Sequence, residues 1–110
     1  MNDPARDSEP CPGEPAPPRD GAIVRVFPIC NRKGLHARAS AKFVQTVERF
    51  DAEVRVTRCG ETVGGTSIMG LMMLAASPGT SITVEATGRE AAEVIEALAT
   101  LVGSRFGEDD

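Results

Sequence analysis

The chain has 110 residues, which leaves room for one domain with one modest core and excludes separate substrate and cofactor domains. Hydrophobic residues make up 41% and charged residues 25%, as in globular proteins, and the absence of Trp and Tyr argues against a nucleic-acid-binding surface built on base stacking. The formal net charge is −4, but residues 22–107 hold ten basic and eight acidic side chains, so the central part carries +2 and suits acidic partners.

The N-terminal segment differs in composition from the rest of the chain. Residues 1–21 hold six of the eight prolines and otherwise small or charged side chains. Such a segment has almost nothing to bury, so we expect a disordered tail. One folded domain is then expected over residues 22–107, followed by an acidic end at 108–110.

The domain is expected to open with a strand and a helix. Ile23–Ile29 is rich in β-branched residues, which predicts a strand, and Pro28 indicates an edge or strand-end position. After the polar loop Cys30–Leu35, residues 37–50 carry apolar side chains at helical spacing. We expect this helix to begin at His36.

A hairpin and a short helix are expected next. Val54 and Val56 alternate with polar neighbours, and Cys59-Gly60 predicts a two-residue turn into a second strand at Glu61–Val63. Ser67–Ala76 is apolar nearly all round and stops at a strong turn signal, so one or two helical turns are expected there.

The last part of the domain is expected to be a strand followed by a helix. Ser81–Thr87 alternates apolar and polar residues, and Thr87-x-x-Glu90 predicts a capping box that opens the helix. The order β-α-β-β-α-β-α indicates a mixed fold, α/β in the broad sense and α+β in the narrower one. We expect an open-faced β-sandwich with a four-stranded, mainly antiparallel sheet and three helices on one face. The buried stripe of the last helix is predicted to consist of Ala91, Val94, Ile95, Leu98, Leu101, Val102 and Phe106.

The sequence shows no sign of a membrane span, a secretory signal or a zinc site. No apolar run approaches the roughly 20 residues that span a bilayer, and no secretory signal is present, so a cytoplasmic protein without membrane insertion is expected. Cys11, Cys30 and Cys59 form no CxxC pair and, with one histidine, no zinc-binding spacing. We expect reduced cysteines, no metal and no cofactor.

The most informative residue is His36, the only histidine, which lies where a polar loop turns into a helix. Unpaired N–H groups and the positive end of the helix dipole meet there, so a phosphoryl group on the imidazole would find donors in place. Arg38 adds a charge-assisted donor, and Arg32, Lys33 and Lys42 add positive charge nearby. Local chemistry leaves a second interpretation open, in which His36 only caps the helix and the basic side chains are solvated.

The wider pattern favours the first interpretation. Gly34-Leu35-His36-Ala37-Arg38 resembles the active-site motif of HPr, the histidine phosphocarrier family of the phosphoenolpyruvate-dependent phosphotransferase system. Thr66-Ser67-Ile68-Met69-Gly70-Leu71-Met72 resembles the regulatory-serine segment of that family. The resemblance spans about residues 23–106. Phe50-Asp51-Ala52-Glu53-Val54, Glu85-Ala86-Thr87-Gly88 and Phe106-Gly107-Glu108-Asp109 look most like the nitrogen-related, regulatory branch.

The resemblance implies that Nδ1 of His36 takes a phosphoryl group from Enzyme I and passes it to an Enzyme IIA-type protein, with Arg38 steadying the group. It implies a carrier rather than a stand-alone enzyme, with a monomer expected. Ile68, Met69, Met72 and Lys42 would dock the partners. Ser67 would cap the short helix; this serine is phosphorylated by an HPr kinase/phosphorylase in many members of the family and is only a cap in others, so both roles stay open.

Departures from the family pattern limit what can be carried over. Ala39 replaces the usual proline after the active-site arginine, which should cost little because alanine favours helices. Gln45, Glu48 and Gly70 stand where lysines are common in the sugar-transporting system, which weakens a role in sugar transport.

Two other classes of function remain open from the residues alone. An enzyme using His36 with Ser40 or Ser67 would need an acid to orient the imidazole and a shaped pocket. A ligand-sensing or interaction module would use His36 only as a helix cap. A nucleotide-binding loop at Gly60–Ser67 is rejected, because Thr66 stands where that motif requires lysine.

Overall fold

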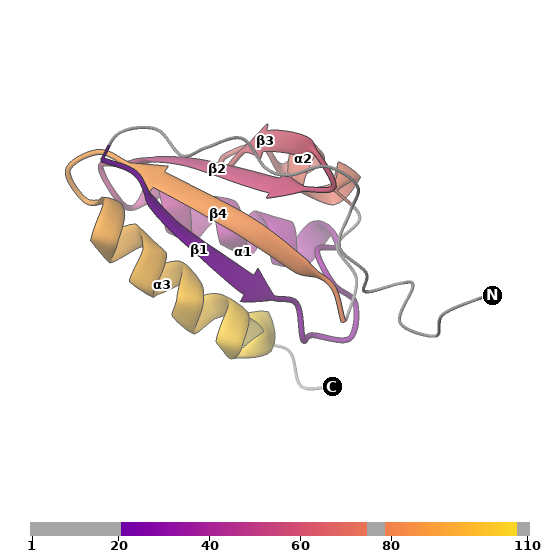
Figure 1. The fold of residues 1–110 in the computed structure, drawn as a ribbon. Coiled ribbons are helices and arrows are strands. Elements are labelled where there is room, and N and C mark those ends of the chain that lie inside the picture. Colours follow the sequence, from indigo (N-terminus) through magenta and orange to yellow (C-terminus); the bar gives the residue numbers. More distant parts are fainter. Residues whose placement is uncertain (1–20, 75–78, 108–110) are drawn as a thin grey trace.

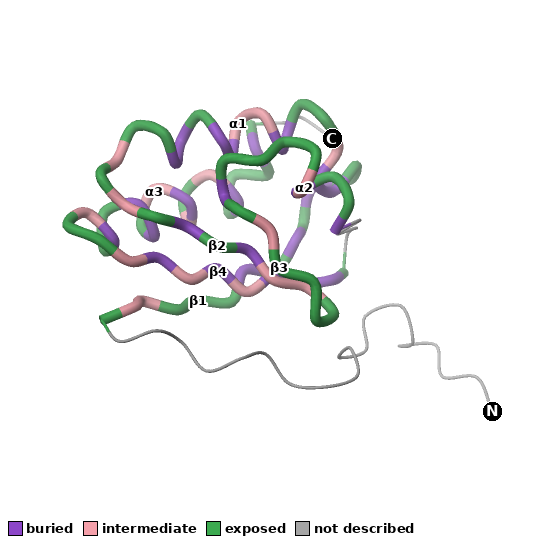
Figure 2. Tube along the Cα trace, turned by 90° about the horizontal axis from the view of Figure 1, so that it is seen from above, coloured by how far each residue is buried: buried purple, intermediate pink, exposed green. Residues whose placement is uncertain are grey.

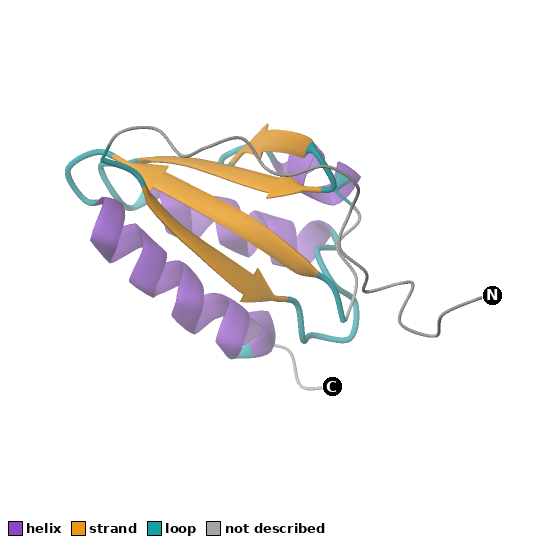
Figure 3. Cartoon of the chain, in the orientation of Figure 1, coloured by secondary structure: helices purple, strands orange, loops and turns teal. Residues whose placement is uncertain are grey.

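The computed structural model describes residues 21–74 and 79–107, which form one sheet and three α-helices (Figures 1 and 3). The order of elements confirms the predicted β-α-β-β-α-β-α pattern. The predicted tail, apart from Gly21, and the acidic end 108–110 lie outside the described residues. The elements are β1 (Ile23–Pro28), α1 (Ala37–Glu48), β2 (Glu53–Arg58), β3 (Glu61–Gly64), α2 (Ile68–Met73), β4 (Ser81–Thr87), α3 (Ala91–Gly103) and a 3₁₀ turn, η2 (Arg105–Gly107).

The sheet has the strand order β1-β4-β2-β3, and every neighbouring pair is antiparallel. The last strand in the chain, β4, therefore lies between β1 and β2, with Ala86 opposite both Ile23 and Val54. Seen from above, the three helices lie on one side of the sheet and leave the other side open (Figure 2). This arrangement confirms the predicted open-faced sandwich.

The core lies between the sheet and the helices. Alternate residues of β2 and β4 point into it, because side chains alternate between the two faces of a strand. No helix in residues 21–74 and 79–107 is long and apolar enough to cross a bilayer. The hydrophobic residues of β2, β4, α1 and α3 that are at least nine-tenths buried in this core are Val54, Val56, Ile82, Val84, Ala86, Ala39, Phe43, Val44, Val47, Ala91, Val94, Ile95, Leu98 and Val102.

The β2–β3 hairpin turns at Cys59-Gly60, as the sequence predicts. Both residues have positive φ, 56° and 79°, which is the backbone of a two-residue turn that keeps Arg58 opposite Glu61. Cys59 is disulfide-bonded, so the expectation of reduced cysteines is wrong at this position, whereas Cys30 is a free, exposed thiol. The spacing of cysteines along the chain does not reveal which thiols meet in space.

The capping box predicted at Thr87-x-x-Glu90 is not formed. Thr87 ends β4, and the N-cap of α3 is Glu90, whose side chain makes no capping bond. Instead, Glu90 Oε1 accepts a hydrogen bond from the N–H of Asp51 at 2.7 Å, and the Asp51 carbonyl accepts one from the N–H of Glu90 at 2.9 Å. The carboxylate thus ties together two loops that are distant in sequence, which a local capping pattern cannot anticipate.

Phe106 is buried as predicted, but it lies beyond the last helix rather than on its stripe. Helix α3 ends at Gly103, and Arg105 and Phe106 have φ of 58° and 57°, the left-handed region that non-glycine residues rarely occupy. The Phe106 ring is 1% exposed, and its carbonyl accepts a hydrogen bond from Lys42 Nζ at 2.6 Å. Burial of the ring and this contact offset the backbone strain.

We expect a chain lacking residues 1–21 to unfold at nearly the same temperature as the whole chain, because that segment offers almost no apolar surface. Calorimetry measures the unfolding temperature of both chains, with a reductant present so that the Cys59 disulfide contributes to neither. A fall of many degrees would show that the tail packs on the domain.

Candidate functional site

His36 is the N-cap of α1, which confirms the predicted start of the helix. Its Nδ1 accepts hydrogen bonds from the N–H groups of Arg38 and Ala39, with N···N distances of 3.1 and 3.4 Å. Its carbonyl accepts the first helical bond, from the N–H of Ser40 at 2.8 Å. The free N–H groups of the helix start therefore converge on one nitrogen of the imidazole.

A buried asparagine fixes the loop that carries His36. Asn31 is fully buried, and its Nδ2 donates to the carbonyl of Gly34 at 2.8 Å. The N–H of Gly34 returns a bond to the Asn31 carbonyl at 3.2 Å, and Gly34 has a φ of 64° that suits glycine. Asn31 was not predicted as a site residue, although an asparagine close before a glycine is a turn signal.

Ser40 is part of the same scaffold. Its hydroxyl is buried and donates to the Leu35 carbonyl at 3.1 Å, and the Leu35 side chain is itself in the core. The Ser40 hydroxyl is thus committed to the backbone of the loop. This geometry counts against the alternative in which His36 activates Ser40 as a nucleophile.

Two predicted cations lie on the first turns of α1. Arg38 is exposed, while Lys42 is half-buried and donates to the carbonyl of Phe106. The two residues are four positions apart and so share one face of the helix. The contact ties Lys42 to the C-terminal part of the domain, a partner that sequence reasoning missed because it is 64 positions away.

Helix α2 presents an apolar surface, as predicted. Ile68 is 40%, Met69 71% and Met72 40% exposed, whereas Leu71 and Leu74 are buried. Met73, which was not predicted as a docking residue, is 77% exposed. Helix α2 contacts α1 and lies at the end of the molecule where α1 begins (Figure 1). We call Ile68, Met69, Met72 and Met73 the α2 patch.

Ser67 is the N-cap of α2, and its Oγ accepts a hydrogen bond from the N–H of Gly70 at 2.9 Å. Gly70 packs closely at this point: a Cβ added there would be 2.8 Å from Ser67 Oγ and 2.9 Å from Val63 Cβ. A side chain at position 70 would therefore push α2 away from β3. Glycine at this position fits the observed packing.

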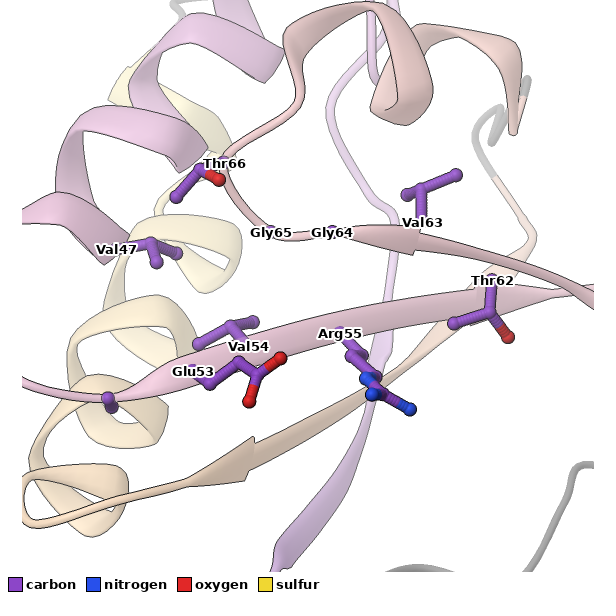
Figure 4. A pocket seen from close by; sticks show the side chains of 10 residues that line it. Val47, Glu53, Val54, Arg55, Thr62, Val63, Gly64, Gly65 and Thr66 are labelled. Carbon is purple, nitrogen blue, oxygen red and sulfur yellow. The ribbon is translucent and has the colours of Figure 1, made fainter.

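A pocket of about 490 Å³ lies elsewhere, where β2, β3 and α1 meet (Figure 4). Val47 and Val54 face each other there, whereas Glu53 and Arg55 lie on the opposite side of β2 (Figure 4). The two charged side chains of the pocket therefore point away from its apolar wall. None of the predicted site residues lines the pocket. Among the described residues, no group of three metal-binding side chains is found.

Comparisons with known proteins agree on one family. Residues 23–104 match the PTS-HPr family model, described as the PTS HPr component phosphorylation site. The chain is 52% identical over 88 residues to phosphocarrier protein HPr of Neisseria meningitidis, covering 80% of this chain and 99% of that protein. It is 36% identical over 86 residues to phosphocarrier protein NPr of Shewanella violacea, covering 78% and 94%. The solved structure of HPr from Thermoanaerobacter tengcongensis matches with a TM-score of 0.76 at 39% identity, covering 80% and 99%.

We expect Asn31→Ala to lower the free energy of unfolding by about 1–3 kcal/mol, because the loop loses a buried donor and gains a cavity. Denaturant unfolding monitored by circular dichroism measures the change. Lys33→Ala, at an exposed position of the same loop, is the control and should change stability by less than about 0.5 kcal/mol. Equal stabilities of the two variants would contradict the role given to Asn31.

Proposed function

Because the chain belongs to the HPr family, the phosphocarriers of the phosphotransferase system, we propose that His36 is the residue that carries the phosphoryl group. The observation that supports this proposal is the pair of N–H groups, from Arg38 and Ala39, directed at Nδ1. A nitrogen that accepts hydrogen bonds carries no proton, and its lone pair becomes free for attack when the two N–H groups turn to another acceptor. In the neutral ring the proton is then on Nε2, and Nδ1 is the nucleophile.

The transfer follows from this geometry. Nδ1 of His36 attacks the phosphorus of a phosphohistidine on the donor, a new N–P bond forms, and the donor's N–P bond breaks. The phosphoryl oxygens then take the place of Nδ1 as acceptors for the N–H groups at the start of α1. Attack by the histidine of an acceptor protein reverses these events and restores the capped imidazole.

Arg38 supports the phosphorylated state in this proposal. Arg38 lies in the first turn of α1, and its own N–H is one of the two directed at Nδ1 of His36. A phosphoryl group adds nearly two negative charges, which a guanidinium can meet with paired, charge-assisted bonds. Arg38 therefore stabilises the loaded carrier without taking part in bond formation.

We propose Enzyme I as the donor and an Enzyme IIA-type protein as the acceptor, both meeting the carrier in the cytoplasm. Each would cover the start of α1 and the α2 patch, which lie at the same end of the molecule (Figure 1). Lys42 lies beside that surface, although its ammonium is also bonded to Phe106. The carrier is proposed to act as a monomer, which a molar mass near 11.6 kDa in light scattering would support and twice that mass would contradict.

The finer proposal is a regulatory system of the nitrogen-related type. Its support is the set of motifs around Phe50–Val54 and Glu85–Gly88, and Gln45 and Glu48 in place of lysines on α1. The NPr relative is less similar than the HPr relative from Neisseria, so the acceptor has to be decided by transfer rates. Faster transfer to a sugar-specific than to a nitrogen-type Enzyme IIA would overturn this assignment.

His36→Ala should abolish phosphoenolpyruvate-dependent labelling by Enzyme I. Labelling is measured with radioactive phosphoenolpyruvate, and folding by circular dichroism. The substitution also removes the helix cap, which costs about 0.5–2 kcal/mol of stability. His36→Asn keeps a capping oxygen but offers no phosphate acceptor, so it should match the wild type in stability and still take no label. Labelling of either variant would refute the central proposal.

Ser67 is proposed as a site of regulatory phosphorylation by an HPr kinase/phosphorylase. Its hydroxyl is exposed and borders the α2 patch. A phosphoryl group there would add negative charge beside apolar side chains that must lose water when a partner binds. The charge would repel an acidic partner, while the helix would tolerate it because negative charge suits a helix N-terminus.

We expect Ser67→Asp to slow phosphoryl transfer from Enzyme I to His36. The reason is that the added charge weakens binding of Enzyme I, by on the order of 1–3 kcal/mol at low salt. Stability should barely change, because Asp caps a helix about as well as Ser. Ser67→Asn is the matched control, since it keeps a capping oxygen without the charge. Equal transfer rates for Ser67→Asp and Ser67→Asn would show that Ser67 acts only as a cap.

A further inference from the structure

Helix α2 is too short to hold its own position. It has six residues, and isolated helices below about 12 residues are marginal in water. Only Leu71 of these six is buried, so most of the helix faces outward. The orientation of the α2 patch must therefore come from contacts with the rest of the domain.

The first turn of α2 and its N-cap have three such contacts. The Leu71 side chain is fully buried in the core, Ser67 caps the first turn, and Gly70 lies flush against Val63 of β3. These contacts fix where the helix starts and which side faces the domain. The far end of the helix, where Met72 and Met73 lie, is held by the buried side chain of Leu74 just beyond it and by a further contact to its backbone.

Arg58 supplies this backbone contact, in addition to the buried Leu74 side chain. Its Nη1 donates a hydrogen bond to the carbonyl of Leu74, the C-cap of α2, at 3.0 Å. The last carbonyls of a helix lack intrahelical partners, and a cation there also meets the negative end of the helix dipole. Arg58 is partly buried, so this bond is screened less than one on the open surface.

The hairpin holds Arg58 in place for this contact. Arg58 is the last residue of β2 and pairs with Glu61 across the turn at Cys59-Gly60. The positive φ values of the two turn residues set the register of this pairing. The guanidinium thus joins a rigid strand end to the end of a short, outward-facing helix.

We propose that Arg58 is a positioning residue for partner docking: it fixes the C-terminal end of α2 so that the α2 patch is already in its binding orientation. This inference rests on the proposed docking role of α2. Holding the patch in one orientation lowers the entropy cost of forming the complex. Loss of the bond should therefore weaken docking without changing the chemistry at His36.

The test compares Arg58→Gln with the wild-type full-length chain in steady-state phosphoryl transfer from Enzyme I. The Michaelis constant of Enzyme I for the carrier should rise about three- to tenfold, because a charge-assisted hydrogen bond that orders the patch is lost. The maximal rate should stay the same. Arg58→Lys, which keeps a cationic donor, should restore most of the lost affinity.

Arg25→Gln is the matched control. Arg25 also lies on a strand and bonds to a helix, through Glu96 of α3 at 3.2 Å, but it is on β1, at the opposite edge of the sheet from β3. We expect it to leave the Michaelis constant unchanged. A rise equal to that of Arg58→Gln would overturn the proposal, because it would point to a general loss of rigidity.

Hydrogen exchange separates positioning from a general structural role. In Arg58→Gln the amides of Met73 and Leu74 should exchange faster, while those of the core strands β2 and β4 stay protected. Faster exchange throughout the domain would overturn the proposal, as would an unchanged Michaelis constant in a variant that accepts phosphate normally. A wild-type chain that Enzyme I does not label would instead overturn the proposed function, and this inference with it.

Discussion

The interaction on which the site depends is the pair of hydrogen bonds from the N–H groups of Arg38 and Ala39 to Nδ1 of His36. A histidine elsewhere on the helix would have neither a free N–H group within reach nor a fixed ring. The surrounding loop keeps the ring at this position, with Asn31 closing the turn and Leu35 inserted in the core. The site is therefore built mostly from backbone groups, and its side chains serve to place that backbone.

The sheet carries this arrangement. Ile29 follows β1, and its N–H and carbonyl are bonded to the carbonyl of Thr80 and the N–H of Gly79, just before β4. The loop that leads to His36 thus follows a strand pair, β1 and β4, whose register consists of six facing pairs of residues. The packed core of strands and helices therefore fixes the position of this loop, and with it the position of the His36 imidazole at the edge of the core.

Much of the fold could be predicted because it follows from local patterns. Alternation in Ser81–Thr87 marks a strand, and Cys59-Gly60 marks the hairpin turn; the structure confirms both. The expectations that failed concern groups whose partner is distant in sequence. Glu90 bonds to Asp51 instead of forming a capping box, and Cys59 is disulfide-bonded. A local pattern shows which kinds of group a residue can bond to, but not which distant group the fold places beside it.

The same distinction holds for the candidate site. The position of His36 at a helix start and the exposure of Met69 could be predicted from the polar-to-apolar change and the apolar excess around them. The bonds of Lys42 to Phe106 and of Arg58 to Leu74 could not, because each requires the three-dimensional path of the chain. Met73 was missed since its apolar character alone does not distinguish a core residue from an exposed one.

The open face of the sheet has a practical consequence. Its side chains on β2 and β4, among them Arg55 and Thr83, are turned away from the helices, and His36 and the α2 patch belong to the helical side. A fluorophore or an immobilising linker attached on the open face would leave His36 and the α2 patch uncovered. The open face is therefore a suitable place to label or immobilise the protein when binding of partner proteins is measured.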